Sequence, residues 1–317
     1  MIGRNEGARL GECLQSLQPH SSHIIYADSA SDDESVALAR GLGVEVVALS
    51  DSVQLSAAAG RVAGFSQLMA KFSDVEFVQF IDGDCLLHPN WLEAAVQFLN
   101  THPRAAVVCG RRYEAHPSAS IYNAICDVEW DTPVGQADAC GGDALFRVSA
   151  YFEVGGFNEK LLAGEEPELC GRLGAKGWEV WRIDALMTEH DARMLHFVQW
   201  WRRSRRGGFG FAQVWDESRR SGRPLYGRQI VSALVWVVAI PAVIIAFTIL
   251  LKQPLAVLAL PLIYCAQILR IAKKMRADRP RRLEQSMYTL LAKVPESLGA
   301  MSYFLGMKRP TAVRSAA

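Results

Sequence analysis

Short apolar runs alternate with amphipathic stretches along the first 190 residues of the chain. The apolar runs, which predict strands, are HIIYAD (23–28), VEVVAL (44–49), VEFVQFID (75–82) and RAAVVCGR (104–111). Helical periodicity predicts helices before and between them, at 9–17, 33–42, 56–72 and 89–99. Strands that alternate with helices of this length predict an α/β fold, in which helices cover both faces of a mostly parallel sheet. In such sheets, ligands bind at the carboxyl ends of the strands.

The pattern changes after residue 191, where the apolar stretches become much longer. Residues 230–251, IVSALVWVVAIPAVIIAFTILL, contain no charged side chain. At ~1.5 Å rise per residue, such a helix crosses the roughly 30 Å hydrocarbon core of a membrane; the alternative is a buried core helix, which we disfavour. The next stretch, LAVLALPLIYCAQILRI (255–271), is shorter and ends near Arg270, whose side chain can reach the membrane surface. Together they predict a transmembrane helical hairpin.

Basic residues flank this hairpin and predict its orientation. Arginines cluster before it, at 202–228, and lysines and arginines follow it, at 273–282, whereas Lys252 is the only charged residue between the spans. The positive-inside tendency then predicts a multi-pass protein of the inner (plasma) membrane, with its N-terminal domain and its C-terminus in the cytoplasm. The segment 286–307 has Lys293 and Glu296 at its centre, which suits an amphipathic helix on membrane lipids better than a third span.

These features divide the chain into four predicted parts. They are an α/β domain at 1–206, a basic linker at 207–229, two transmembrane helices at 230–271 and a basic, amphipathic tail at 272–317. We interpret the arginines of the linker as an orientation signal that also contacts anionic headgroups, and we expect no nucleic-acid partner.

Composition excludes some site classes. The chain has 317 residues, a formal net charge of +1 and 50% hydrophobic residues. Its seven cysteines contain no CxxC pair, which disfavours a zinc knuckle or a dithiol redox site and fits a reducing compartment. The polar opening, MIGRNEGARL, does not read as a signal peptide.

Two aspartates, Asp82 and Asp84, stand directly after an apolar strand, in the sequence QFIDGDC. Neighbouring carboxylates repel each other, so a cation between them would explain their spacing. Carboxylate oxygens suit Mg²⁺ or Mn²⁺, and Mg²⁺ is commonly held by one or two carboxylates plus substrate phosphates. The alternative is an ordinary solvated turn, because this spacing also occurs by chance.

Three further polar clusters follow apolar or glycine-rich segments. Asp28 ends a predicted strand and precedes two serines that can bond a ribose or a base, although Ser31 or Asp32 alternatively caps the next helix. Glu165 and Glu166 precede a helix predicted at 167–176. They either complement the dipole of that helix or supply a general base that faces a substrate hydroxyl. His190 follows another apolar strand. Whether its side chain binds a ligand or only supports the structure stays open.

The ordered set of these segments resembles the family 2 glycosyltransferases with the A-type fold, over about residues 2–206. The matching segments are GRNEGARLGECLQSL (3–17), ADSASDDES (27–35), SAAAGRVAG (56–64), FIDGDC (80–85), GGDALFRVSAYFEVGGFNE (141–159), GEEPELCGRLGAKGW (164–178) and EHD (189–191). The resemblance implies an inverting, non-processive enzyme that transfers a sugar from a nucleotide-diphosphate sugar, with a UDP-sugar favoured, to a hydroxyl acceptor. A cytoplasmic membrane face suits an acceptor that is a glycan or is carried on a lipid.

The resemblance also implies roles for individual residues. Asn5 and Glu6 would lie by the base and ribose, Asp28 would hold the uracil or ribose, and Arg61 would lie next to the nucleotide. Asp82 and Asp84 match the pair that binds Mg²⁺ or Mn²⁺, and His190 a residue near the metal and diphosphate. Gly142 and Asp143 match the acceptor-side loop. Glu166 stands where the family has the Asp that is the inverting general base.

Three departures from the family pattern stand out. Met1 and Ile2 are the only residues left of the apolar strand that the family has before the Asn-Glu pair, so the first strand is expected to be short or to continue upstream. Glu166 replaces an Asp, which moves the carboxylate outward by about one methylene. QWWRRS (199–204) only loosely matches the motif of processive synthases.

Two other functions remain open from the sequence. A nucleotidyltransferase would need a glycine-rich, basic N-terminal loop for the triphosphate, and GRNEGARLG (3–11) only faintly resembles one. A catalytically silent membrane scaffold of the same fold would retain the sheet but would not bind UDP in a metal-dependent way.

Overall fold

The computed structural model describes residues 1–21, 23–50, 55–220, 224–276 and 281–307. The described chain divides into two compact units. The first unit comprises residues 1–117 and 126–193, and the second comprises residues 118–125 and 194–307.

The first unit begins with a small parallel sheet in the order β1–β2–β3. Its strands are β1 (Ile2–Gly3), β2 (Ile25–Asp28) and β3 (Glu45–Ala48). Its helices are α1 (Ala8–Leu17), α2 (Ser35–Gly41) and α3 (Ala57–Lys71). All four residues of β2 are buried, as expected of a parallel strand that is covered on both faces. In α1 the buried side chains follow the helical period, and they are Leu10, Cys13, Leu14 and Leu17.

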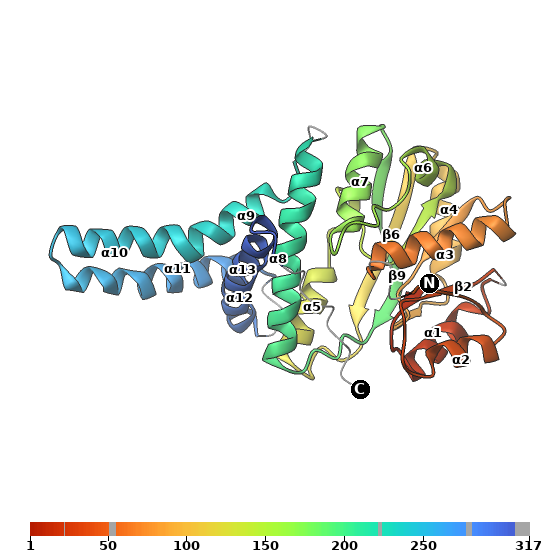
Figure 1. The fold of residues 1–317 in the computed structure, drawn as a ribbon, viewed down its shortest axis with the longest axis horizontal. Coiled ribbons are helices and arrows are strands. Elements are labelled where there is room, and N and C mark those ends of the chain that lie inside the picture. Colours follow the sequence, from red (N-terminus) through yellow and green to blue (C-terminus); the bar gives the residue numbers. More distant parts are fainter. Residues whose placement is uncertain (22, 51–54, 221–223, 277–280, 308–317) are drawn as a thin grey trace. The chain divides into compact units, whose positions relative to one another are not determined.

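A second, larger sheet follows, in the order β4–β8–β6–β9–β5, with β7 paired to β9. Its strands are β4 (Phe77–Phe80), β5 (Cys85–Leu87), β6 (Ala105–Glu114), β7 (Gly135–Ala137), β8 (Ala144–Arg147) and β9 (Glu179–His190). The remaining helices that contribute to this unit are α4 (Trp91–Thr101), α5 (Ile121–Trp130), of which residues 126–130 belong here, α6 (Val148–Glu153) and α7 (Glu165–Ala175) (Figure 1).

The predicted α/β class is confirmed, but the larger sheet is mixed and not mostly parallel. Only β6 and β9 pair in parallel, whereas β8 is antiparallel to both of its neighbours, β4 and β6. Periodicity along the chain reports that a segment is a buried strand but carries no information about the direction of its partner. The core of the unit lies around these strands and contains Trp91, Leu99, Val107, Phe146 and Leu169.

The pairing of the strands brings distant polar residues to one edge. The two sheets meet where Ile2 pairs with Asp82 in a parallel bridge. In the larger sheet, Glu114 at the end of β6 lies opposite His190 at the end of β9. His190 also lies opposite Cys85, at the start of β5. Strand register therefore assembles the polar cluster that follows β4.

The second unit is helical. Its elements are α8 (Phe197–Arg220), α9 (Gly227–Leu234), the π-helical turn η1 (Val235–Ala239), α10 (Ile240–Leu250), the 3₁₀ turn η2 (Pro254–Leu258), α11 (Ala259–Lys274), α12 (Arg282–Leu291) and α13 (Lys293–Phe304). Gly208 of α8 and Gly299 of α13 let these two helices touch, because a Cβ on either would overlap the backbone of the other helix. The segment expected to form one surface helix, 286–307, thus belongs to two helices, and α13 packs on α8.

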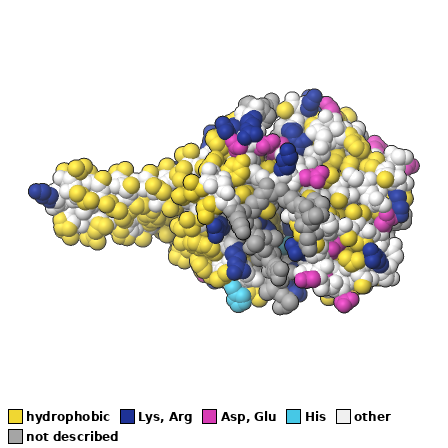
Figure 2. Space-filling model, in the orientation of Figure 1, with side chains coloured by type: hydrophobic (Ala, Val, Ile, Leu, Met, Phe, Trp, Pro, Cys, Tyr) yellow, Lys and Arg dark blue, Asp and Glu magenta, His cyan; other side chains and the backbone are white. Residues whose placement is uncertain are grey.

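Two stretches of this unit are long and apolar enough to cross a membrane, Gly227–Leu250 and Pro254–Lys274. Only 6% of the apolar window of each is buried within the protein, whereas a core helix would be mostly buried. The core-helix alternative for residues 230–251 is therefore not supported. Helices α10 and α11 run side by side as a hairpin (Figure 1), and hydrophobic side chains cover it (Figure 2). The Tyr264 hydroxyl of α11 donates to the Trp236 carbonyl of η1.

Candidate active site

The predicted pair Asp82 and Asp84 lies in the turn between β4 and β5. The Ile2 N–H donates to the Ile81 carbonyl at 3.2 Å and the Gly83 N–H to the Ile2 carbonyl at 2.7 Å, so β1 fixes the backbone on both sides of Asp82. The Asp82 N–H donates to Asp143 Oδ1 at 3.0 Å. This turn is therefore held by contacts from two separate parts of the chain.

Asp82 lies between two arginines, of which Arg61 is buried and Arg112 is partly buried. Arg61 Nη2 of α3 is 3.0 Å from Asp82 Oδ1, and Arg112 Nη1 of β6 is 3.4 Å from Oδ2. Burial alone would raise the pKa of Asp82, but Arg61 and Arg112 outweigh burial and hold the pKa below its ordinary value. Asp82 is thus ionised at neutral pH, and it is ready to act as an oxygen ligand.

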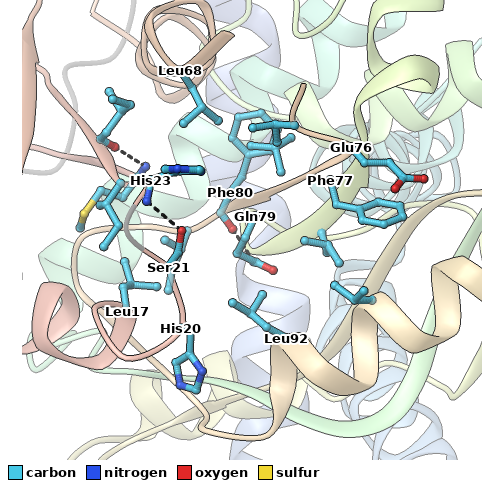
Figure 3. Close-up of a pocket in the computed structure, with 18 of the residues that line it drawn as sticks. Leu17, His20, Ser21, His23, Leu68, Glu76, Phe77, Gln79, Phe80 and Leu92 are labelled. Carbon is cyan, nitrogen blue, oxygen red and sulfur yellow. Dashed lines mark hydrogen bonds between the residues drawn. The ribbon is translucent and has the colours of Figure 1, made fainter. Parts of the chain in front are cut away.

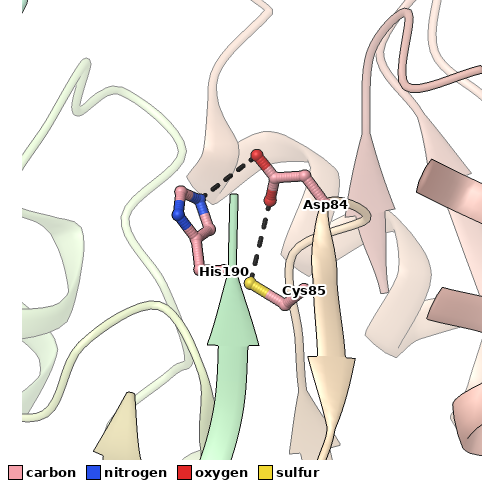
Figure 4. A group of neighbouring side chains, drawn as sticks. All are labelled: Asp84, Cys85 and His190. Atoms are coloured by element: carbon pink, nitrogen blue, oxygen red, sulfur yellow. Dashed lines mark hydrogen bonds and ion pairs between the residues drawn. The ribbon is translucent and has the colours of Figure 1, made fainter. Parts of the chain in front are cut away.

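Asp84 bonds to His190, the strand-end histidine. Figure 4 shows the His190 ring facing the carboxylate of Asp84. His190 Nε2 is 3.2 Å from Asp84 Oδ2. The other ring nitrogen, Nδ1, is 3.9 Å from Oε2 of buried Glu114, and the edge of the Trp130 ring system lies against the imidazole. Burial and Arg112 lower the pKa of His190, but Asp84 and Glu114 outweigh them, so the pKa is raised.

Glu165 and Glu166 share one arginine with Asp82. Arg61 Nη1 is 2.8 Å from Glu165 Oε1 and 2.9 Å from Glu166 Oε1. Burial and the neighbouring Glu165 raise the pKa of Glu166 to about 7, against the opposing effect of Arg61. A carboxylate with a pKa near neutral can take up and release a proton at physiological pH, as a general base requires.

Gly142 keeps space beside this group. A Cβ at position 142 would lie 2.6 Å from Arg61 Nη2, 3.0 Å from Asp82 Oδ2 and 3.4 Å from Glu166 Oε1. Any side chain there would displace the arginine that joins the two carboxylates. Gly142 therefore belongs to the site through its lack of a side chain.

The predicted start of the helix that follows Glu166 is wrong. The sequence predicted that Glu165 and Glu166 precede a helix at 167–176. Helix α7 instead begins at Glu165, after a left-handed Gly164 (φ 84°), so Glu166 lies within the first turn. Proline is accepted in a first helical turn because its missing N–H has no intrahelical acceptor there, and the helix starts earlier than the proline suggests.

Asn5, Glu6 and Asp28 lie at the end of the small sheet. Asn5 has a left-handed backbone (φ 58°), and its side chain exchanges hydrogen bonds with Asp32 at 2.6 and 2.9 Å. Asp28 is buried and accepts bonds from Tyr26 and Ser31. The capping alternative for this segment is not observed, because the helix α2 has Glu34 as its N-cap residue and no side-chain cap bond.

Glu6 connects this end of the small sheet to Asp84. Glu6 Oε2 is 2.6 Å from Arg9 Nη2, and Arg9 Nη1 is 3.8 Å from Asp84 Oδ2. Burial and Asp84 raise the pKa of Glu6 to about 7. The structure therefore brings the predicted residues Asn5, Glu6 and Asp84 to one edge.

Asp143 is fully buried, which changes how it can contribute. Its carboxylate accepts from the Asp82 N–H and from the Thr188 hydroxyl at 2.7 Å, and it lies 3.5 Å from Arg112 Nη1. Asp143 thus positions Asp82 and Arg112, and its side chain has no exposed surface to offer an acceptor.

The donor set fits a divalent cation. Ligand atoms of Asp84, Cys85 and His190 lie within 4.8 Å of one another, as do those of Asp82, Cys85 and Asp143. Carboxylate oxygens with one imidazole nitrogen suit Mn²⁺ or Mg²⁺, while the buried thiol of Cys85 is protonated because burial raises its pKa. Without the thiol, the residues that could hold the ion are Asp84 and His190 in the first group and Asp82 and Asp143 in the second.

Sequence reasoning missed three members of this cluster. Arg112 and Glu114 lie just after the strand predicted at 104–111, and Trp130 lies in a helix that was not predicted. Arg112 stacks on the Trp130 ring at 4.8 Å and contacts Asp82, 30 residues earlier in the chain. No local sequence pattern predicts that an arginine on a strand will pair with a carboxylate so far away in the chain.

Comparison with known proteins assigns the fold and the class of enzyme. Residues 1–151 match the model of the family described as glycosyl transferase family 2. This part of the chain therefore resembles a family 2 glycosyltransferase domain. This confirms the predicted enzyme class, and the scaffold and nucleotidyltransferase alternatives have no comparable support.

Two known proteins resemble the glycosyltransferase over most of its length. Glycosyltransferase AglE of Haloferax volcanii is 24% identical over 235 residues, which cover 70% of this chain and 75% of AglE. The solved structure of the mannosyltransferase PcManGT from Pyrobaculum calidifontis, in complex with GDP-Man and Mn²⁺, superposes with a TM-score of 0.60 at 14% identity, covering 97% of this chain and 87% of that one. This structural likeness confirms the expected A-type glycosyltransferase fold.

Proposed function

We propose that the protein transfers a sugar from a nucleotide-diphosphate sugar to a hydroxyl acceptor, with metal dependence and inversion of the anomeric configuration. The observation that carries the proposal is the convergence of three parts on one site. Asp82 and Asp84 form the cation-binding edge, Asn5, Glu6 and Asp28 lie at the adjacent strand end, and Arg61 joins Asp82 to Glu166. This arrangement would bring a diphosphate and a general base to one edge of the sheets.

Asp82, Asp84 and His190 would hold Mn²⁺ or Mg²⁺, with the pairing of His190 to Asp84 fixing the orientation of the ring. When bound, the cation supplies positive charge to stabilise the leaving diphosphate. Arg61 and Arg112 add fixed positive charge on either side of Asp82, which favours the approach of an anionic donor.

Glu166 is the proposed general base. Its position near Asp82, through Arg61, places it beside the donor's sugar if the diphosphate lies on the metal edge. Glu166 would accept the proton of the acceptor hydroxyl as that oxygen attacks the anomeric carbon and the bond to the diphosphate breaks. This single displacement inverts the anomeric configuration, and the proton stays on Glu166.

Asn5, Glu6 and Asp28 would bind the nucleoside. The side chain of Asp28 is itself occupied by Tyr26 and Ser31, so in this proposal it shapes the loop that contacts the base or ribose. A UDP-sugar is the favoured donor by family resemblance, while the neighbour PcManGT was solved with GDP-Man. Both nucleotides therefore belong in the first assay.

The acceptor is proposed to be lipid-linked or a polysaccharide at the cytoplasmic face of a membrane. The two long apolar helices and the flanking basic residues support this location. In this proposal, residues 1–206 form the catalytic domain, 207–229 the juxtamembrane linker, 230–271 the membrane hairpin and 272–317 the tail. Non-processive transfer is supported by Trp200, which is buried between Tyr122 and Tyr288 and serves packing in the helical unit.

The proposal is tested with membranes that contain the full chain, supplied with UDP- and GDP-sugars and with Mn²⁺ or Mg²⁺. We expect metal-dependent release of the nucleoside diphosphate and a product whose anomeric configuration, read by NMR, is inverted. The Asp84→Asn variant should release none. A product with retained configuration would contradict the role of Glu166, and turnover in excess chelator would contradict the role of the metal.

A further inference from the structure

The imidazole of His190 is held by a hydrogen bond on one side only. Its Nε2 atom lies 3.2 Å from Asp84 Oδ2 (Figure 4), whereas Nδ1 is buried and has no hydrogen-bond partner in the described part of the chain. A histidine that binds a metal ion usually donates its other ring N–H to a carboxylate or a backbone carbonyl, and that bond fixes the orientation of the ring. None of the described residues orients His190 in this way.

Glu114 is the acidic residue beside Nδ1, but its carboxylate is bonded elsewhere. Glu114 Oε2 is 3.9 Å from His190 Nδ1, which is beyond hydrogen-bond distance. The carboxylate instead accepts the His116 N–H at 3.2 Å and the Ala192 N–H at 3.1 Å. These two backbone bonds tie Glu114 to the segments that follow β6 and β9. Glu114 therefore attracts His190 by its charge but does not set the direction of the ring.

Trp130 makes a ring contact that can set this direction. Its ring centroid is 4.7 Å from that of His190, and the two ring planes meet at 80°. This is the edge-to-face arrangement that aromatic rings prefer. Rotation of the imidazole away from Asp84 would break the contact with Trp130. The packing of the two rings therefore favours the orientation in which His190 Nε2 faces Asp84.

The position of Trp130 is itself fixed by contacts at the end of α5. Asp127, three residues earlier, is 2.7 Å from Arg111 Nη2, and Asp131, the next residue, is 3.6 Å from Arg111 Nε. These ion pairs tie the chain to β6 on both sides of Trp130. The Arg112 guanidinium packs on the Trp130 ring at 4.8 Å. The indole is thus held in place without any contribution from His190.

A cavity in the first unit offers no other support for the ring. It has a volume of about 1020 Å³, and Figure 3 shows its apolar helical side chains around Gln79 and Phe80 of β4. Asp84, Trp130 and His190 do not line it. A ligand in this cavity would therefore not contact the His190 ring, and Trp130 stays the group that orients it.

We propose that Trp130 is a positioning residue of the cation site, whose ring holds His190 in the orientation in which Nε2 faces Asp84. This inference rests on the proposed function, because it takes Asp84 and His190 as ligands of Mn²⁺ or Mg²⁺. Trp130 acts through His190, in the place where other metal sites have a hydrogen-bonded partner. Loss of such a partner typically weakens metal binding by about 10- to 100-fold.

The test measures binding of Mn²⁺ alone to the full chain in detergent, from the electron paramagnetic resonance signal of free Mn²⁺. We expect Trp130→Leu to weaken binding by about 10-fold or more, and Trp130→Phe, which keeps an aromatic ring, to restore most of the affinity. Trp181→Leu is the matched control and should bind like wild type. Trp181 lies on the same strand as His190 but nine residues earlier, which is about 30 Å along an extended chain.

A double-mutant comparison separates positioning from a general effect on the fold. In the His190→Ala background, Trp130→Leu should lose most of its effect on Mn²⁺ binding, because the residue through which Trp130 acts is gone. If Trp130→Leu weakens binding as strongly in that background as in the wild type, Trp130 does not act through His190 and the proposal is wrong. It is also wrong if Trp130→Phe binds as weakly as Trp130→Leu, because the aromatic ring is then not what orients the histidine.

Two further results distinguish this proposal from the proposed function. If His190→Ala weakens Mn²⁺ binding but Trp130→Leu binds like wild type, Trp130 has no positioning role and the cation site still stands. If His190→Ala binds like wild type, or if the wild type binds no Mn²⁺, the proposed cation site fails and the role of Trp130 fails with it.

Discussion

Replacing Glu166 by Gln should make the protein more stable at alkaline pH while it abolishes most of the activity. The side chain of Glu166 is 15% exposed and lies 2.9 Å from Arg61, beside Glu165. Its pKa is raised from 4.5 to about 7, chiefly by burial and by Glu165. The folded protein therefore holds this carboxylate in a less favourable environment than water, and Gln resembles its protonated form.

The sign and size of the effect follow from that shift. Below pH 4.5 the group is protonated in the folded and unfolded states, so it adds no cost; above pH 7 the folded state bears the full cost of ionisation. A difference of 2.5 pKa units, at 1.36 kcal/mol each, corresponds to about 3 kcal/mol. The Glu166→Gln variant should thus gain up to about 3 kcal/mol at pH 8.5 and almost nothing at pH 4.5.

The assay is the unfolding of the full chain in detergent and chelator, at both pH values, for wild type and Glu166→Gln. At about 2–4 °C per kcal/mol, the expected gain in melting temperature at pH 8.5 is roughly 6 °C or more. Sugar transfer should fall by about 10²–10⁴, the usual effect of losing a general base. Glu165→Gln is the matched control: it should show no such gain and should lower the pKa of Glu166. Equal stability of wild type and Glu166→Gln at pH 8.5 would refute the reasoning.

Three further predictions concern the site and the membrane segments. The kcat/KM of the wild type should rise with pH around a midpoint near 7, because Glu166 must be ionised to accept a proton, and a profile without this limb would contradict that role. Arg112→Met should cost about 3 kcal/mol of unfolding free energy, measured with denaturant, because it leaves buried Asp143 without its guanidinium; Arg112→Lys should cost less. A reporter protein inserted at Gln253 should lie outside the cytoplasm, and one fused after Ala317 should lie in the cytoplasm. If both reporters lie on the same side of the membrane, the proposed topology is contradicted.

The local elements of the first unit were predictable because each depends on residues that are close in sequence. The predicted strand at 23–28 contains β2, and the predicted helix at 56–72 contains α3 with Ser56 as its side-chain cap. The Asp82 and Asp84 pair was visible for the same reason, since it directly follows an apolar strand.

The long-range pairings were not predictable from these patterns. The direction of β8 and the approach of Arg112 to Asp82 depend on contacts across about 30 or more residues, and no period reports them. The shared arginine is a similar case: Arg61 meets Glu165 across 104 residues, so the competition between Glu165 and Glu166 for one guanidinium appears only in the folded chain.

The metal-dependent binding of a nucleoside diphosphate tests the central claim most directly. UDP and GDP are titrated calorimetrically into the full chain in detergent, with Mn²⁺ and with excess chelator, for wild type, Asp84→Asn and the control Asp191→Asn. Asp191 is an acidic neighbour of His190 that lies outside the proposed cation site. The account predicts that one nucleotide binds with Mn²⁺, that chelator or Asp84→Asn weakens binding by about 100-fold, equal to 2.7 kcal/mol, and that Asp191→Asn binds like wild type. Binding that is indifferent to both the metal and Asp84, or no binding of either nucleotide, would contradict it.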